Sequence, residues 1–278
     1  MKKTHVTMAV AATCATIGLT TQAQAVTLPT AAAAFDIQLS ATGLSATQST
    51  IFDNAVTWWE TLIAGYIYDI SGVSAFNNTL NITATIEAID GVGGVLGSAG
   101  PDGYYYQPGA VSPFAYATAG SMRFDSADIS NMESNGSLFE VIVHEIAHVI
   151  GIGTLWDVVG AYDEVNAPGE YTGAWGLLGY QAECDAGATF VPVELDGGTG
   201  TAHGHWDETW SCTDGNQALM TGYINSPTFL SMATVGSLID LGYAINVTAV
   251  PLPGGGALAL GGFGVMGLMA RRRRKDAA

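Results

Sequence analysis

Alternation of apolar and polar residues marks three candidate strands in the first half of the chain. Residues 80–89 alternate along their whole length, which predicts a strand with one buried face. Shorter runs at residues 35–39 and 121–125 predict two more strands. Residues 45–64 repeat apolar side chains at helical spacing and predict an amphipathic helix. The order strand, helix, strand, strand predicts an N-terminal lobe built on a twisted sheet.

Two stretches between these strands lack a clear period. Residues 90–101 are rich in glycine and predict a loop or an edge strand, because no phosphate-binding pattern or following helix accompanies the glycines. Tyr104, Tyr105 and Tyr106 form an aromatic cluster that we expect to pack over a strand rather than to line a cleft.

The second half of the chain is less regular. Residues 154–204 are glycine-rich and aperiodic, and loops of that length are usually functional or pinned by a crosslink. Residues 228–241 show helical spacing and residues 243–247 predict a short strand. We therefore expect an α+β protein whose C-terminal lobe is irregular, contains one helix, and faces the N-terminal lobe across a cleft.

One helix, residues 137–151, carries the candidate chemistry. Ser137 and Glu140 have the spacing of a capping box. His144 and His148 are four residues apart, so both imidazoles lie on one face and can reach a single Zn²⁺ ion. Glu145 points about 100° away from His144 around the helix, where a general base for a zinc-bound water belongs.

The alternative is a surface helix whose two histidines and glutamate lie in water. The remaining positions of the helix are almost all apolar, which predicts burial instead, and buried imidazoles and carboxylates need partners. A metal ion is the simplest partner for all three groups.

A catalytic zinc site needs a third protein ligand and one open position. Thr154 stands where a compact site would carry its third histidine. Downstream acidic candidates are Asp157, Glu164, Glu170 and Glu183. Of the five histidines, His203 and His205 are the two that remain after the helix pair and His5 near the N-terminus, so one of them is a strong candidate.

Acidic residues dominate the body of the chain. Of the eight Lys and Arg residues, two precede residue 26 and five follow residue 270, which leaves Arg123 alone between them. Of the 25 Asp and Glu residues, 24 lie in the same interval. A body this acidic makes nucleic acid and anionic membranes unsuitable partners. Calcium is a second candidate ion because of two Asp-Gly pairs, Asp90-Gly91 and Asp102-Gly103.

Both ends of the chain have the composition of targeting signals. Residues 1–25 combine two lysines, an apolar middle and an Ala-Gln-Ala end, which predicts a signal peptide removed by signal peptidase. Residues 250–278 begin with Val-Pro-Leu-Pro, continue as a glycine-rich apolar run and end in a basic cluster. This tail resembles the PEP-CTERM class of bacterial sorting signals. The resemblance implies transient membrane anchoring and handling by an exosortase; a permanent single-span anchor is the alternative.

Two cysteines remain between these signals, Cys184 and Cys212. An exported chain meets oxidising conditions, so we predict a disulfide between them. The body between the signals, residues 26–249, is long enough for a single catalytic domain.

Several short motifs together resemble the leishmanolysin-type metallopeptidases, a metzincin family. They are His144-Glu-Ile-Ala-His148-Val-Ile-Gly151, then after a long insertion Gly204-His205-Trp206, then Ala218-Leu-Met220 and the segment 231–243. The resemblance implies a metzincin fold, with His144, His148 and His205 as zinc ligands and Glu145 as the base. It implies Met220 as the residue beneath the metal. Ala218 departs from the acidic residue common at that place, and no inhibitory cysteine is present.

These features predict an exported zinc endopeptidase that acts on protein or peptide substrates in the extracellular space or at the bacterial cell surface. Glu145 would assist the attack of a zinc-bound water on the peptide bond. We expect the strand 121–125 to be an edge strand that holds an extended substrate. Tyr223 is interpreted as a packed tyrosine, with steadying of an oxyanion as the other option. Two alternatives stay open: a non-catalytic metal-binding surface or matrix adhesion protein, and a hydrolase of non-peptide amides.

Overall fold

The computed structural model describes residues 27–70, 78–108, 113–210, 212, 217–224, 227–246 and 248. The N-terminal half contains strands β1 (Asp36–Thr42), β2 (Ile63–Tyr66), β3 (Thr79–Glu87), β4 (Gly97–Gln107) and β5 (Phe114–Asp125), and helices α1 (Ala46–Leu62), α2 (Ile129–Asn135) and α3 (Leu138–Ile150). The C-terminal half contains β6 (Glu170–Tyr171), α4 (Ala174–Glu183), β7 (Val191–Pro192), β8 (Gln217–Ala218), β9 (Thr228–Phe229), α5 (Met232–Leu241) and β10 (Tyr243–Ile245). The predicted α+β class is confirmed.

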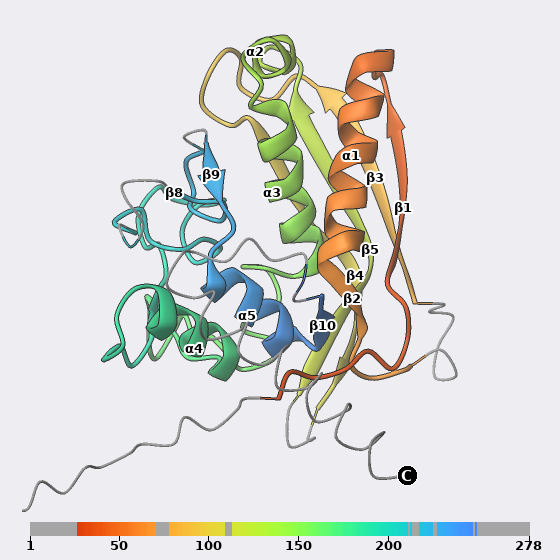
Figure 1. Cartoon of the computed structure of the whole chain (residues 1–278). Helices are drawn as coiled ribbons and strands as arrows, with labels where there is room; N and C mark the ends of the chain where they lie inside the picture. The colour runs from red at the N-terminus through yellow and green to blue at the C-terminus, as the bar shows by residue number, and fades with distance from the viewer. Residues whose placement is uncertain are drawn as a thin grey trace, which may run out of the picture.

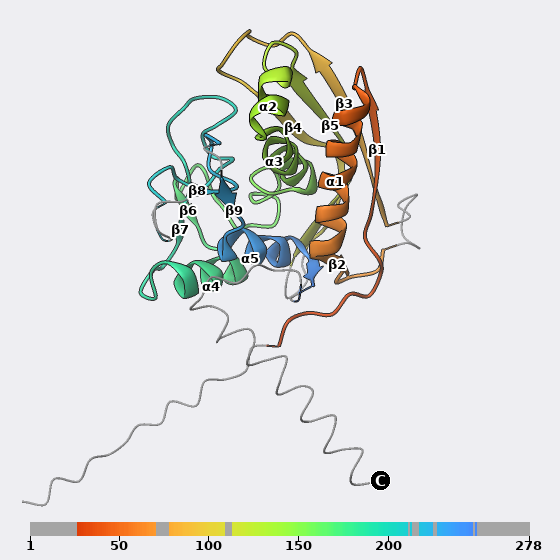
Figure 2. The same ribbon diagram turned by 45° about the horizontal axis from the view of Figure 1, so that its top comes forward.

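A four-stranded sheet forms the frame of the N-terminal half. Its order is β1-β3-β5-β4, with β1, β3 and β5 parallel and β4 antiparallel to β5. Figures 1 and 2 show α1 and α3 side by side against one face of this sheet. The alternation in β3 has the expected cause: Leu80, Ile82 and Ala84 are buried under the helices, and the residues between them are exposed.

The expected edge strand is an internal strand. Residues 121–125 belong to β5, which is paired on one side with β3 and on the other with β4. Both of its edges are occupied, so it cannot accept an extended peptide, and that prediction is wrong. The outer strand beside α3 is β4, which begins in the glycine-rich stretch 90–101 for which the sequence left a loop or an edge strand open.

The ends of the helices follow the sequence in part. Ser45 caps α1 with a complete capping box: its hydroxyl accepts from Gln48 N, and the side chain of Gln48 accepts from Ser45 N. Ser137 starts α3 without a side-chain cap, and Glu140 accepts a hydrogen bond from the amide of Thr228 in β9 at 3.2 Å. The capping box predicted for α3 is therefore not formed, because its glutamate binds another element.

Two helices, not one, lie in the C-terminal half. Helices α4 and α5 pack against each other with glycine at the contact: a Cβ atom on Gly179 or Gly236 would collide with the backbone of the opposite helix. The N-terminus of α4 has no local cap, and the carboxylate of Asp240 in α5 accepts hydrogen bonds from Trp175 N and Gly176 N at 2.9 and 2.8 Å. Helix α4, which the sequence did not predict, is thus stabilised by contacts with α5.

Two further predictions concern the crosslink and the tail. Cys184 and Cys212 form the expected disulfide, which ties the end of α4 to the chain after Trp210. The predicted signal peptide and residues 250–278 lie outside the described residues. Within the part of the chain that the structure describes, no helix is long and apolar enough to cross a bilayer.

Candidate metal centre

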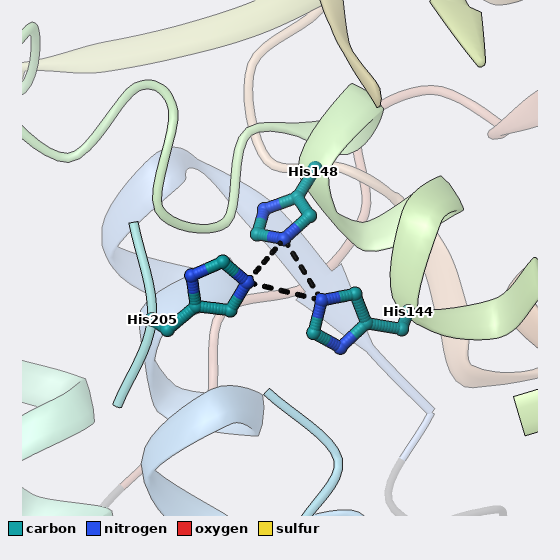
Figure 3. Close-up of side chains that lie close together, drawn as sticks. All are labelled: His144, His148 and His205. Atoms are coloured by element: carbon teal, nitrogen blue, oxygen red, sulfur yellow. Dashed lines mark hydrogen bonds between the residues drawn. The ribbon is translucent and has the colours of Figure 1, made fainter. Parts of the chain in front are cut away.

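Three histidine side chains converge at the face of α3 that looks toward the C-terminal half. His144 and His148 extend from adjacent turns of α3, and His205 comes from a loop on the other side (Figure 3). Their Nε2 atoms form a triangle with sides of 3.1, 3.0 and 3.0 Å. All three residues are buried.

The opposite ring nitrogens fix how each imidazole carries its proton. The Nδ1 atom of His144 donates to the carbonyl oxygen of Leu219 at 2.7 Å, and that of His205 donates to Thr201 O at 2.8 Å. The Nδ1 atom of His148 donates to Ile152 O at 2.9 Å. A carbonyl oxygen can only accept, so each neutral ring is protonated at Nδ1 and has an unprotonated Nε2. Three lone pairs therefore face one another.

This arrangement fits a cation and is unfavourable without one. No proton lies between the Nε2 atoms to turn their contacts into hydrogen bonds while the rings are neutral. Two nitrogens bound at about 2.0–2.1 Å to a tetrahedral ion are about 3.3 Å apart, within a few tenths of an ångström of the triangle's sides. The three histidines are thus positioned to bind a metal ion, and in the described part of the chain they form the only such group of His, Cys, Asp and Glu side chains.

The surroundings keep the imidazoles neutral. Burial, together with the neighbouring ring of His205, lowers the pKa of His144 from 6.5 to about 3. Burial also lowers the pKa of His148 well below its usual value and lowers that of His205. Neutral imidazole is the form that binds a metal, so the ligands do not have to lose protons first at neutral pH.

Backbone hydrogen bonds hold the loop of His205 between two other segments. His205 O accepts from Glu194 N at 2.9 Å, and Trp206 N donates to Met220 O at 2.9 Å. Because His205 and Trp206 are bonded to different segments, the third ligand is held from both sides.

The indole of Trp206 anchors the same loop in the core. It is fully buried, stacks on Trp156 with ring centroids 4.3 Å apart, and donates from Nε1 to the hydroxyl of Thr234 in α5 at 2.8 Å. Trp156 lies in the segment that follows α3, so this segment and the loop that carries His205 meet at the ring pair.

Glu145, the predicted base, directly follows the first histidine in α3. Its side chain is buried, and burial raises its pKa from 4.5 to about 8. Its Oε2 atom has no hydrogen-bond partner among the described residues. A carboxyl group held this way has a strong affinity for a proton, which is the property of a general base.

Several of the other candidates for the third ligand are engaged elsewhere, and none of the candidates other than His205 belongs to the histidine group. His203 adopts a left-handed backbone with φ of 67°, and its Nδ1 is hydrogen-bonded to the hydroxyl of Tyr162 at 2.6 Å. Thr154 donates to the carbonyl oxygen of His148, and Glu183 accepts from Met232 N at the start of α5. The structure therefore brings His205, rather than His203 or the acidic residues, to the helix pair.

Some expectations near the site need correction or addition. Met220 is fully buried, as the interpretation required. Tyr223 is 60% exposed, so it is not the packed tyrosine that the sequence suggested. Leu219 was missed, because it acts on His144 through its carbonyl oxygen, and a backbone role leaves no signal in the type of residue.

The proposed calcium ligands are used in other ways. The carboxylate of Asp90 accepts from Val95 N, and that of Asp102 accepts from the hydroxyl of Ser121. Neither joins a group of three acidic side chains in the described ranges, so calcium gains no support.

No protein-family profile and no curated protein sequence matches the chain. The interpretation of the site therefore depends on its geometry.

Proposed function

We propose that this protein is a zinc-dependent endopeptidase. One observation carries the proposal: three neutral imidazoles present their Nε2 atoms to one point, and the residue next to the first ligand is a buried carboxyl group. Two histidines four apart on a helix with a glutamate after the first are the known arrangement of zinc peptidases. Three nitrogen ligands leave a fourth position for water or substrate.

Nitrogen ligands favour zinc over the ions that prefer oxygen. Imidazole suits Zn²⁺, Cu²⁺, Ni²⁺ and iron, and carboxylates suit Ca²⁺ and Mg²⁺. Three protein ligands are also the number found in catalytic zinc sites. When bound, it would polarise the scissile carbonyl and increase the acidity of water.

The residues of the chain perform the remaining steps. His144, His148 and His205 would hold the ion, and each ring is oriented by the carbonyl oxygen on its Nδ1. Glu145 takes a proton from the attacking water and passes it to the leaving nitrogen of the peptide bond. Its buried position suits this transfer, because a carboxylate that is poorly solvated accepts a proton readily.

The order of elements also supports a metzincin-type chain. A sheet with β4 antiparallel at its edge precedes α3, and a long connection separates α3 from the third ligand. His205 is followed by the buried Trp206, and Met220 lies in a turn after β8. These features agree with the leishmanolysin-type family that the motifs resemble.

We include export in the proposal. The disulfide between Cys184 and Cys212 is typical of proteins in oxidising compartments. The two terminal segments that would direct export and sorting lie outside the described residues. A surface adhesion protein with a structural ion is the competing function. A structural zinc site is usually closed by four protein ligands, whereas three histidines converge here.

Two substitutions at neighbouring histidines test the metal site. We expect His205→Ala to lose the bound metal and casein hydrolysis, and His203→Ala to retain the metal, because His203 is bonded to Tyr162 instead. Metal content is measured by mass spectrometry after purification with zinc. Retention of a full equivalent of zinc by His205→Ala would overturn the ligand assignment.

Glu145→Gln separates catalysis from metal binding. We expect this variant to keep the metal and to lose hydrolysis by a factor of about 10²–10⁴, the usual contribution of a general base. A wild-type protein that binds zinc but cleaves neither casein nor a peptide library would favour the adhesion function. If the protein cleaves no peptide of the library but hydrolyses a non-peptide amide, the hydrolase of non-peptide amides is favoured.

A further inference from the structure

The edge strand β4 touches the buried carboxyl group of Glu145 at one position. A Cβ atom on Gly97 would lie 2.8 Å from Oε1 of Glu145 and 3.0 and 3.1 Å from its Cδ and Cγ atoms. Real Cβ atoms essentially never come so close to an oxygen, so the end of the Glu145 side chain fills the space that any other residue would need. The backbone of β4 at Gly97 therefore forms one wall of the pocket for this carboxyl group.

The backbone conformation does not explain the glycine. The φ angle of Gly97 lies outside the left-handed region, so an alanine could adopt the same backbone. Gly100 in the same strand also has an ordinary φ, and a Cβ atom there would meet nothing within 4 Å. Only Gly97 is limited by the neighbouring glutamate.

The start of β4 is fixed in place from behind. Asp125, at the end of β5, donates from its backbone N to Leu96 O at 3.0 Å. Its side-chain Oδ2 accepts from the amides of Asp90 and Gly91 at 2.8 and 2.9 Å. Asp128 accepts from Gly93 N at 2.9 Å, so the loop before β4 is held at several amides.

This anchor stays charged over the pH range in which the protein would work. Hydrogen bonds from backbone amides, that of Ala127 first, lower the pKa of Asp125 to about 2. Because the ionised carboxylate continues to accept from these amides, the loop and the first residue of β4 keep their position relative to α3.

We propose that Gly97 is a positioning residue for Glu145: the β4 backbone at this glycine sets where the carboxyl group lies beside the three histidines. The inference builds on the proposed function and adds a determinant outside the His-Glu-x-x-His motif. It follows that a methyl group at residue 97 displaces the carboxyl group, since the end of a glutamate side chain moves at lower cost than the backbone. The metal ligands and the fold should be unaffected.

The test compares Gly97→Ala with Gly100→Ala in the full chain loaded with zinc. We expect Gly97→Ala to lower kcat about a hundredfold, the usual effect of misplacing a reacting group by about 1 Å. The KM, the zinc content and the Tm should stay close to those of the wild type. Gly100→Ala should match the wild type in all four quantities. An unchanged kcat in Gly97→Ala would overturn the inference.

A double substitution distinguishes positioning from a general loss of structure. In the Glu145→Gln background the base is already absent, so adding Gly97→Ala should lower the residual rate no further. An additive loss, or a joint loss of zinc and Tm, would show that Gly97 acts on the fold and would overturn the positioning role.

A crystal structure of Gly97→Ala gives a readout that does not need activity. A displaced Glu145 carboxyl group with unchanged histidines supports the inference, and an unmoved one refutes it. If the wild-type protein binds zinc and cleaves no peptide, the proposed function fails while this steric relation is still tested by the structure.

Discussion

Replacing the carboxyl group of Glu145 by an amide should stabilise the metal-free protein, and the gain should grow with pH. Burial raises the pKa of Glu145 to about 8 from the ordinary 4.5. Between these values the unfolded chain has released a proton that the folded chain keeps, so the free energy of unfolding falls as the pH rises. Glutamine does not titrate, so the Glu145→Gln variant does not lose this free energy of unfolding as the pH rises.

The size of the gain follows from the two pKa values. With a pKa of 4.5 in the unfolded chain and about 8 in the folded chain, the loss of stability is about 0.8 kcal/mol at pH 5 and about 3.3 kcal/mol at pH 7. Glu145→Gln should therefore add about 2.5 kcal/mol more at pH 7 than at pH 5. An amide of nearly the same shape leaves packing unchanged, so the difference between the two pH values isolates the charge.

The histidines act in the opposite direction and cancel in this comparison. Burial lowers the pKa of His144 to about 3. Below about pH 6.5 the imidazole is therefore protonated in the unfolded chain and stays neutral in the folded chain. The metal-free protein should thus lose stability toward acid in the wild type and the variant alike. Subtracting the two unfolding curves removes the contribution.

Urea unfolding of metal-free protein with its disulfide intact measures the effect at both pH values. An equal gain at pH 5 and pH 7 would refute the raised pKa of Glu145. Adding zinc supplies a control, because a nearby cation favours the carboxylate and lowers its pKa. The pH-dependent gain should then vanish.

Three further outcomes test the fold around the site. Replacing Cys184 and Cys212 by serine should lower the free energy of unfolding by about 3–4 kcal/mol, the chain-entropy value for a loop of 28 residues, as measured by urea unfolding. Asp240→Ala leaves two amides of α4 without their acceptor and should cost about 3 kcal/mol in the same assay. Asp125→Asn turns an N–H donor toward amides that also donate, so hydrogen exchange at residues 89–91 should become faster than in the wild type.

The sequence predicted best where a local period or a rare residue type carried the information. The strand β3 and the helix α1 follow from alternation and helical spacing over long runs. The small number of histidines narrowed the third ligand to His203 or His205, and the family resemblance favoured His205. The structure places His205 with the helix pair. The sequence alone therefore predicted that His205 would join His144 and His148.

The failures have a common physical cause, which is stabilisation by distant parts of the chain. Strand β4 contains several glycines and one proline, and it is extended because it pairs with β5. Helix α4 contains Gly176 and Gly179, which weaken a helix on its own. The same glycines permit close packing, against Tyr171 and α5 respectively, and Asp240 caps its first turn. A local reading of the sequence could not detect these partners.

The ligand set also has a consequence for the order in which the molecule matures. His148 and His205 are 57 residues apart, and the intervening segment must fold before the third imidazole arrives. A half-finished chain would offer two imidazoles and bind the ion weakly. Tight binding of the ion therefore requires that the segment between His148 and His205 has folded. The ion should be released early when this segment unfolds.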